Sequence, residues 1–156
     1  MNKRSFLRFA ATAAAATGLV NGAAAQGTGN GVVRVKSAYS IPESIARIKA
    51  DLKTKGILFF QEIDQSALAH AAGITLRPST LLEFGNPPLG TQFITGHPDA
   101  GLEWPVRLLL TQDESGQVWA VWNDFSWIAR RHGISNRDEQ FATATGVVAS
   151  ITSTLR

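Results

Sequence analysis

The sequence contains no cysteine, and this absence narrows the chemistry open to the protein. Thiol catalysis, iron–sulfur clusters and thiolate zinc sites are excluded, because each of them requires a cysteine sulfur. A chain without thiols also suits an oxidising compartment, where a stray thiol would be a liability. A domain of about 130 residues needs no disulfides, since it buries roughly two thirds of its unfolded surface.

An excess of positive charge is missing from most of the chain as well. The sequence has 15 Lys+Arg against 12 Asp+Glu, and Lys3, Arg4 and Arg8 supply three of the basic residues at its start. Without those three, 12 basic residues face 12 acidic ones. No basic stripe remains to attract phosphates, so we expect no nucleic-acid partner.

A hydrophobic run long enough to span a bilayer is also absent. The Ala-rich segment from Phe9 to Val20 has about 12 residues, whereas a membrane span needs roughly 20. Ala23-Ala24-Ala25 then forms a small-residue cleavage signal. We therefore predict a signal peptide over residues 1–25 with cleavage after Ala25, a periplasmic location, and no membrane anchor in the mature chain.

The export route has two readings. Residues 2–8 (NKRSFLR) resemble the twin-arginine export motif, with Lys3 in place of the first arginine. The low hydrophobicity of the segment that follows fits that route, which carries proteins already folded. A general secretory signal is the plainer alternative.

The mature chain interleaves short apolar runs with amphipathic stretches and shows no internal repeat. Ser40 and Glu43 form a capping box before one helix, Glu139 occupies the corresponding position of a last helix that starts at Asn136, and residues 113–116 (DESG) link the two strands of a hairpin. Strands are predicted at 32–38, 57–60, 80–84, 104–111 and 117–122, and helices at 41–55, 64–72, 91–96, 124–131 and 136–155.

The apolar run 57–60 is interpreted as a central strand. The order of elements is not the regular alternation of a parallel sheet. It predicts an α+β fold: a mainly antiparallel sheet with helices packed on one face, a two-layer sandwich. Residues 26–39 would be a flexible leader and the first strand, and residues 135–156 a C-terminal helix that completes the same domain.

The stretch FGNPPLGTQF, residues 84–93, has the outline of a nucleotide-binding loop, with Gly85 and Gly90 five residues apart. Thr91 stands where such a loop needs a lysine, and Pro87 and Pro88 cannot donate backbone hydrogen bonds to a phosphate. We interpret the stretch as a stiff turn in which Pro87 forces Asn86 toward extended geometry.

The histidines give no metal-site pattern. His70, His97 and His132 lack the spacing of helical metal ligands, so we predict no metal and no cofactor. His70 is expected to be exposed, and His132 to interact with a helix C-terminus. Asp124 is expected to cap a helix.

Five ordered motifs resemble one family, and FGNP followed by GT is the most specific of them. The motifs are LRPSTLLEFGNP with GT at 76–91, AGLEWP at 100–105, GQVW at 116–119, ND at 123–124 and ARRHG at 129–133. Together they resemble the bacterial domain-of-unknown-function family 302 over residues 40–134. The resemblance implies a compact α+β domain with an antiparallel sheet, a homodimer and no assigned activity. Gln65 and Trp122 depart from the family pattern, which usually has His and Tyr there.

Three functions are compatible with these observations. The first is a dimeric small-ligand or partner-binding module, with a ligand between the FGNP loop and the hairpin. Arg77 would pair with a carboxylate of the ligand. The second is a hydrolase or isomerase that uses His132 or His97 as general base and Asp64 or Asp124 as its orienting carboxylate. The third is a purely structural dimerisation module. The residues predicted to bind a ligand are Arg77, Asn86, Gly90, Thr91, Asn123 and His132.

Overall fold

The computed structural model describes residues 26–27 and 29–156. The predicted signal peptide, with its twin-arginine resemblance and its cleavage site, lies outside the described residues. Gln26–Gly27 form strand β1, which pairs with the following strand inside the segment expected to be a leader. In the described part of the chain, no helix combines the length and the hydrophobicity that a membrane crossing requires.

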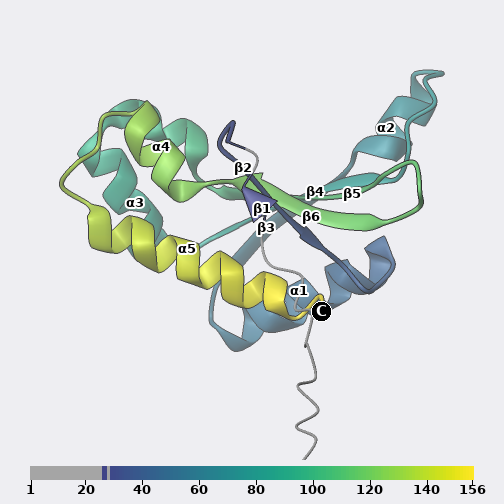
Figure 1. The fold of residues 1–156 in the computed structure, drawn as a ribbon, viewed down its shortest axis with the longest axis horizontal. Helices are drawn as coiled ribbons and strands as arrows, with labels where there is room; N and C mark the ends of the chain where they lie inside the picture. Colours follow the sequence, from purple (N-terminus) through teal and green to yellow (C-terminus); the bar gives the residue numbers. More distant parts are fainter. Residues whose placement is uncertain (1–25, 28) are drawn as a thin grey trace, which may run out of the picture.

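The described residues form one six-stranded sheet in the order β1-β2-β6-β5-β4-β3 (Figure 1). All five pairings are antiparallel. The predicted hairpin is confirmed, and Gly116 at its turn adopts the left-handed conformation (φ 83°) that favours glycine. After β1 the strands are β2 (Val32–Lys36), β3 (Leu58–Asp64), β4 (Ser79–Gly85), β5 (Val106–Gln112) and β6 (Val118–Asn123).

Two long helices, α1 and α5, lie across one face of the sheet, which confirms the predicted α+β architecture (Figure 1). Their apolar stripes point toward the strands and form the core with them. The helices are α1 (Ile41–Thr54), α2 (Gln65–Ala71), α3 (Pro87–Gly96), α4 (Phe125–Arg131) and α5 (Asp138–Ser153), with a short 3-10 helix η1 (Pro98–Glu103) between α3 and β5.

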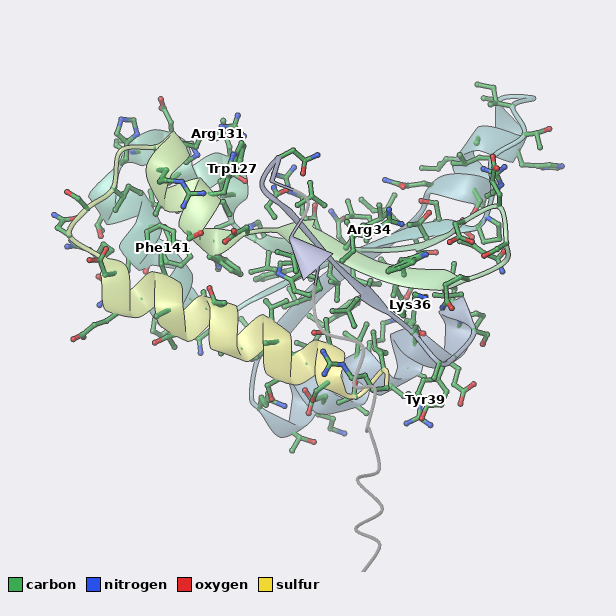
Figure 2. The ribbon with its side chains drawn as sticks, viewed as in Figure 1. Arg34, Lys36, Tyr39, Trp127, Arg131 and Phe141 are labelled. Carbon is green, nitrogen blue, oxygen red and sulfur yellow. The ribbon has the colours of Figure 1, made fainter. Side chains whose placement is uncertain are left out.

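The helix starts follow their capping residues in most cases. Ser40 Oγ accepts a hydrogen bond from the backbone N–H of Glu43 at 3.4 Å, so the predicted cap of α1 is confirmed. The prediction for α5 was wrong: the helix begins at Asp138, and Arg137 precedes it without a side-chain cap. Packing explains why the helix forms nonetheless, since Phe141 in its first turns stacks on Phe93 of α3 at 4.3 Å between ring centroids (Figure 2).

The predicted position of the strand at 57–60 was also wrong. This run opens β3, which is longer than expected and lies at the edge of the sheet, not at its centre. Leu58 and Phe60 are 51 % and 44 % exposed. The pairing with β4 shifts register between Phe59 and Gln61, and the bulge brings Phe60 against the ring of Trp104. The continuous apolar run at 57–60 therefore belongs to an edge strand, and one of its aromatic side chains packs against Trp104.

The face of the sheet opposite α1 and α5 carries a row of half-buried aliphatic side chains. One residue of this row comes from each of four neighbouring strands, and each pairs with the next: Val121 of β6, Leu109 of β5, Leu81 of β4 and Ile63 of β3. None of the four packs against the main core. We refer to this row and the strand surface around it as the open face.

Candidate functional site

The FGNP stretch is the start of helix α3, which corrects its interpretation as a stiff turn. Asn86 has the predicted extended backbone (φ −113°, ψ 108°), and its Oδ1 accepts from the backbone N–H of Leu89 at 3.2 Å. Pro87 and Pro88 occupy the first helical positions of α3, where the missing N–H groups would have no intrahelical partner. The helix thus begins four residues before Thr91, the start expected from the sequence.

The two glycines of this stretch are explained by one aromatic side chain. A Cβ added at Gly85 would lie 2.7 Å from Nε1 of Trp104, and one added at Gly90 would lie closer still. Their spacing therefore serves the close approach of an indole, which comes from the segment after η1, and not the approach of a phosphate. The contact fixes α3 and the end of β4 around Trp104.

A cavity of about 320 Å³ opens beside this indole. It lies between α3, α5, the C-terminal end of α1 and the adjoining ends of β4 and β5. Such a volume falls at the lower end of ligand pockets, which span about 300–1,000 Å³. Its walls are mainly aliphatic, with Ile57, Leu89, Val106, Ala144, Val147 and Val148 among the lining residues.

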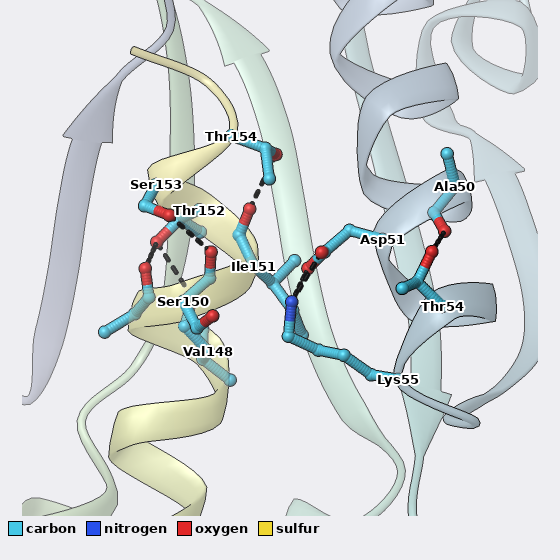
Figure 3. Close-up of polar contacts among 11 residues, drawn as sticks. Ala50, Asp51, Thr54, Lys55, Val148, Ser150, Ile151, Thr152, Ser153 and Thr154 are labelled. Atoms are coloured by element: carbon cyan, nitrogen blue, oxygen red, sulfur yellow. Dashed lines mark hydrogen bonds and ion pairs between the residues drawn. The ribbon is translucent and has the colours of Figure 1, made fainter.

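Four polar side chains line the cavity. Three of them have at least one N–H group that is not used by an acceptor in the described chain. Oδ1 of Asn86 is used by the helix cap, which leaves its NH₂ group. Nε1 of Trp104 has no acceptor among the described residues and is not sealed from solvent. Lys55 pairs with Asp51, one turn earlier on α1, beside the last turns of α5 (Figure 3). The hydroxyl of Thr143 donates to the backbone carbonyl of Glu139 at 2.8 Å.

A second polar group lies on the other side of the same segment, around Glu103. This carboxylate is only 2 % exposed, and its Oε1 lies 3.1 Å from Nη1 of Arg131 and 3.3 Å from Nε2 of His132. Oε2 accepts from Nδ2 of Asn123 at 3.3 Å and has Arg107 Nη2 at 3.8 Å. We refer to these five residues as the Glu103 cluster.

The Glu103 cluster unites four segments, since η1, the start of β5, the end of β6 and the end of α4 each contribute to it. The His132 side chain is 7 % exposed, and the void next to Glu103 measures about 10 Å³, roughly the room of one water molecule. The arrangement satisfies a buried carboxylate with charged and neutral donors. It leaves no space beside the Glu103 carboxylate for an organic substrate.

The remaining histidines and acids do not join this group into a metal centre. His97 is exposed, with its ring centroid 6.1 Å from that of His132, and its Nδ1 accepts from the backbone N–H of Asp99. His70 is exposed at the end of α2, as predicted. Among residues 26–27 and 29–156, no three His, Asp or Glu side chains converge in a metal-ligating arrangement.

Comparison with known proteins places this chain in a family. Residues 33–151 match the family described as "Domain of unknown function DUF302". This chain is a DUF302 protein. The resemblance noted in the sequence is thereby confirmed, and the matched region extends into α5, beyond the motifs that first indicated it.

Other similarities agree with this assignment. The chain is 37 % identical over 123 residues to proteins named fluoride-specific ion channel FluC 1 from Brucella suis and Brucella abortus. The match covers 76 % of this chain but 48 % and 46 % of those relatives, so the DUF302 chain spans about half of their length. A crystal structure titled as an uncharacterized conserved DUF302 protein from Bacillus stearothermophilus superposes with a TM-score of 0.74 at 17 % identity. It covers 81 % of this chain and 99 % of its own, and shows that the fold is shared.

The DUF302 fold brings the six predicted ligand-binding residues to three separate places. Asn86 and Gly90 line the cavity beside Trp104, and Thr91 lies in the same helix with its hydroxyl donating to the carbonyl of Pro87 at 2.7 Å. Asn123 and His132 belong to the Glu103 cluster. Arg77 lies near the tip of the β5–β6 hairpin and pairs with Glu114 at 2.9 Å, with both side chains exposed.

The carboxylates proposed to orient a histidine are helix caps instead. Asp64 Oδ1 accepts from the backbone N–H of Ala67 at 2.9 Å, and Asp124 Oδ1 accepts from that of Ser126 at 2.8 Å. The hydrogen bond from Ala67 lowers the pKa of the Asp64 carboxyl, with Ser66 adding to the effect. The cap predicted at Asp124 is confirmed, and the acid that meets His132 is Glu103.

Sequence reasoning missed Lys55, Trp104 and Glu103 as members of these sites. For Trp104 a signal was present: two glycines that no phosphate site explains imply a bulky neighbour at close range. The two departures from the family pattern have structural partners. Gln65 Oε1 accepts from Ser79 Oγ at 2.8 Å, and Trp122 is 7 % exposed in the core.

Proposed function

We propose that this DUF302 protein is an exported, dimeric module that binds a small molecule in the cavity beside Trp104. The observation that carries the proposal is the cavity itself. Its aliphatic walls and few polar groups have the composition of a ligand pocket. Stiff elements frame it, since the α3 cap, the prolines and the Trp104 contact fix one side and α5 the other.

Blocking the cavity tests this proposal. Val147 is a half-buried lining residue on α5, so Val147→Trp should place an indole in the cavity. Ala149→Trp adds the same side chain on the exposed side of the same helix and serves as the matched control. Saturation-transfer NMR with single-ring aromatic probes that carry different polar groups should give signals with the parent and with Ala149→Trp. Val147→Trp should lose them, and absence of any signal with the parent would contradict the proposal.

The proposal of a dimer rests on the open face. A half-buried row of four aliphatic residues across four strands is a surface that a second copy could cover, because paired sheets bury such rows. Strand β2, next to Val121, carries Arg34 and Lys36 on this same face (Figure 2 labels both residues).

Light scattering on the purified chain measures its molar mass in solution and so tests the proposed dimer. Leu109→Glu places a charge in the middle of the row and should yield monomers from a dimeric parent. Leu102→Glu introduces the same charge at a leucine that is 66 % exposed on η1 and should remain dimeric. A monomeric parent, or a dimeric Leu109→Glu variant, would contradict the dimer through the open face.

The enzymatic alternative has one observation in its favour, the 3.3 Å approach of His132 and Glu103. A general base also needs a substrate within reach of its free nitrogen, and the His132 side chain is only 7 % exposed. The ion-channel activity in the names of the Brucella relatives is not proposed here, because less than half of each relative matches this chain.

A further inference from the structure

We propose that the cavity beside Trp104 selects a small apolar carboxylic acid, bound as its carboxylate. This inference rests on the proposed ligand-binding function and adds the chemical class of the ligand. Two features of the lining lead to it: most of the wall is aliphatic, and three of its polar side chains offer hydrogen-bond donors.

The wall sets the body of the ligand. Leu89, Val106, Val147 and Val148 offer aliphatic surface and no polar atom to a molecule between them. Burial of apolar surface there is favourable by about 25 cal/mol per Å². The volume of about 320 Å³ suits a single ring or a short alkyl chain and excludes a nucleotide or a lipid with long chains.

The polar residues of the lining determine which polar group a ligand should carry. The NH₂ group of Asn86, the indole N–H of Trp104 and the ammonium of Lys55 are donors. The hydroxyl of Thr143 spends its proton on a backbone carbonyl. No Asp or Glu side chain lines the cavity. A ligand amine would find no carboxylate there, whereas a ligand carboxylate would find donors that have no acceptor from the described chain.

Lys55 determines how strongly the cavity should prefer a charged acceptor group on the ligand over a neutral one. Its ammonium bonds both carboxylate oxygens of Asp51, which leaves one of its three N–H donors for a ligand (Figure 3). Asp51 itself does not line the cavity. Since Asp51 already balances the Lys55 charge, the preference for an anion over its neutral isostere should be moderate. A charge-assisted hydrogen bond of this kind corresponds to about ten-fold in affinity.

Calorimetric titration of the full chain with three probes of one shape tests the inference: phenylbutanoate, phenylbutanamide and phenylbutylamine. The acid should bind about ten-fold more tightly than the amide, and the amine should bind more weakly than the amide. Lys55→Met keeps the length of the side chain and should remove the preference for acid over amide. Lys49→Met, on the same helix but paired with Glu62 and away from the cavity, should retain it.

The outcomes separate the two proposals. If all three probes bind with equal affinity, or if Lys55→Met keeps the preference for the acid, the cavity binds ligands but the class assigned here is overturned. If none of the three binds, the ligand-binding function falls and this inference falls with it. Tighter binding of the amine would overturn the class directly.

Discussion

Glu103 and Trp104 are neighbours in the chain, yet their side chains enter opposite kinds of environment. The Glu103 carboxylate is 2 % exposed and has four partners within 3.8 Å, with a void of about 10 Å³ beside it. The Trp104 indole borders a cavity of about 320 Å³ and its N–H has no acceptor in the described chain. The polar group of Glu103 is therefore fully paired and enclosed, whereas that of Trp104 is available to a ligand. We call the surroundings of Glu103 the closed side of this segment and the cavity beside Trp104 its open side.

The difference separates a structural site from a binding site within the same segment. Polar groups that satisfy one another stabilise the fold and leave nothing for a ligand. Polar groups that lack partners beside an apolar cavity cost stability and are available for recognition. His132, the residue with the most familiar catalytic chemistry in the sequence, lies on the closed side. The open side uses an indole, an amide and a lysine.

The largest effect should come from breaking the closed side. Glu103→Ala leaves the buried His132 without its carboxylate and removes the shared partner of Arg131, so we expect the free energy of unfolding to fall by about 3 kcal/mol. Urea unfolding at neutral pH measures it. Glu114→Ala removes an acid from a fully exposed pair and should cost less than about 0.5 kcal/mol. Equal losses in the two variants would show that the Glu103 cluster is not the support described here.

The next effect tests the glycines that frame the open side. Gly90→Ala would place a methyl group inside the indole of Trp104, and we expect a loss of about 2 kcal/mol despite the better helix propensity of alanine. Gly146→Ala in α5 meets nothing within 4 Å and should gain about 0.5–1 kcal/mol by urea unfolding. A Gly90→Ala variant as stable as the parent would mean that Trp104 does not require this glycine.

These two sides differ in how far the sequence could predict them. The helix caps at Ser40 and Asp124 and the β5–β6 hairpin depend on residues close together in the chain, and local patterns predicted them. The edge position of β3 depends on pairing across the sheet, which a continuous apolar run does not encode. The start of α5 without a side-chain cap is likewise a consequence of aromatic packing.

The candidate sites were harder for the same reason. Residues of η1, β6 and α4 meet only when the sheet has formed, so Glu103 looked like one scattered acid among several. Lys55 could not be told apart from other exposed lysines on α1, because its role depends on the distant α5. Asn86 and Gly90 line the cavity because the FGNP motif itself forms that wall, and their contact with a ligand stays a prediction, whereas Arg77 belongs to the hairpin tip.

A smaller change in stability is expected when Lys55, on the side of the cavity, is replaced. In the absence of ligand, Lys55→Met should change the free energy of unfolding by no more than about 0.5 kcal/mol, since the Asp51–Lys55 pair lies at the surface of α1. Thermal unfolding without and with phenylbutanoate separates the two roles of the residue. A loss in the apo protein as large as that of Glu103→Ala would place Lys55 among the structural residues instead.

Asp113 provides the last test, because it is less buried than Glu103 and shows whether burial or hydrogen bonding makes an acid important in this fold. At the hairpin, Oδ1 of Asp113 accepts from the Ser115 hydroxyl at 2.6 Å and Oδ2 from the Trp119 indole at 2.7 Å. These bonds, that of Ser115 first, lower the pKa of Asp113 from 3.8 to about 2. The stabilisation is therefore complete above the unfolded value of 3.8 and is lost as pH falls toward about 2.

We expect Asp113→Asn to be less stable than the parent by a constant amount from neutral pH down to about 4, and to lose that difference below it. Ser115→Ala should narrow the acid window by returning the Asp113 pKa toward its ordinary value. Urea unfolding at a series of pH values measures both variants. A difference between parent and Asp113→Asn that persists unchanged to pH 2 would mean that the hydrogen bonds of this side chain do not distinguish its charged form. Burial, as at Glu103, would then be what makes a carboxylate important in this fold.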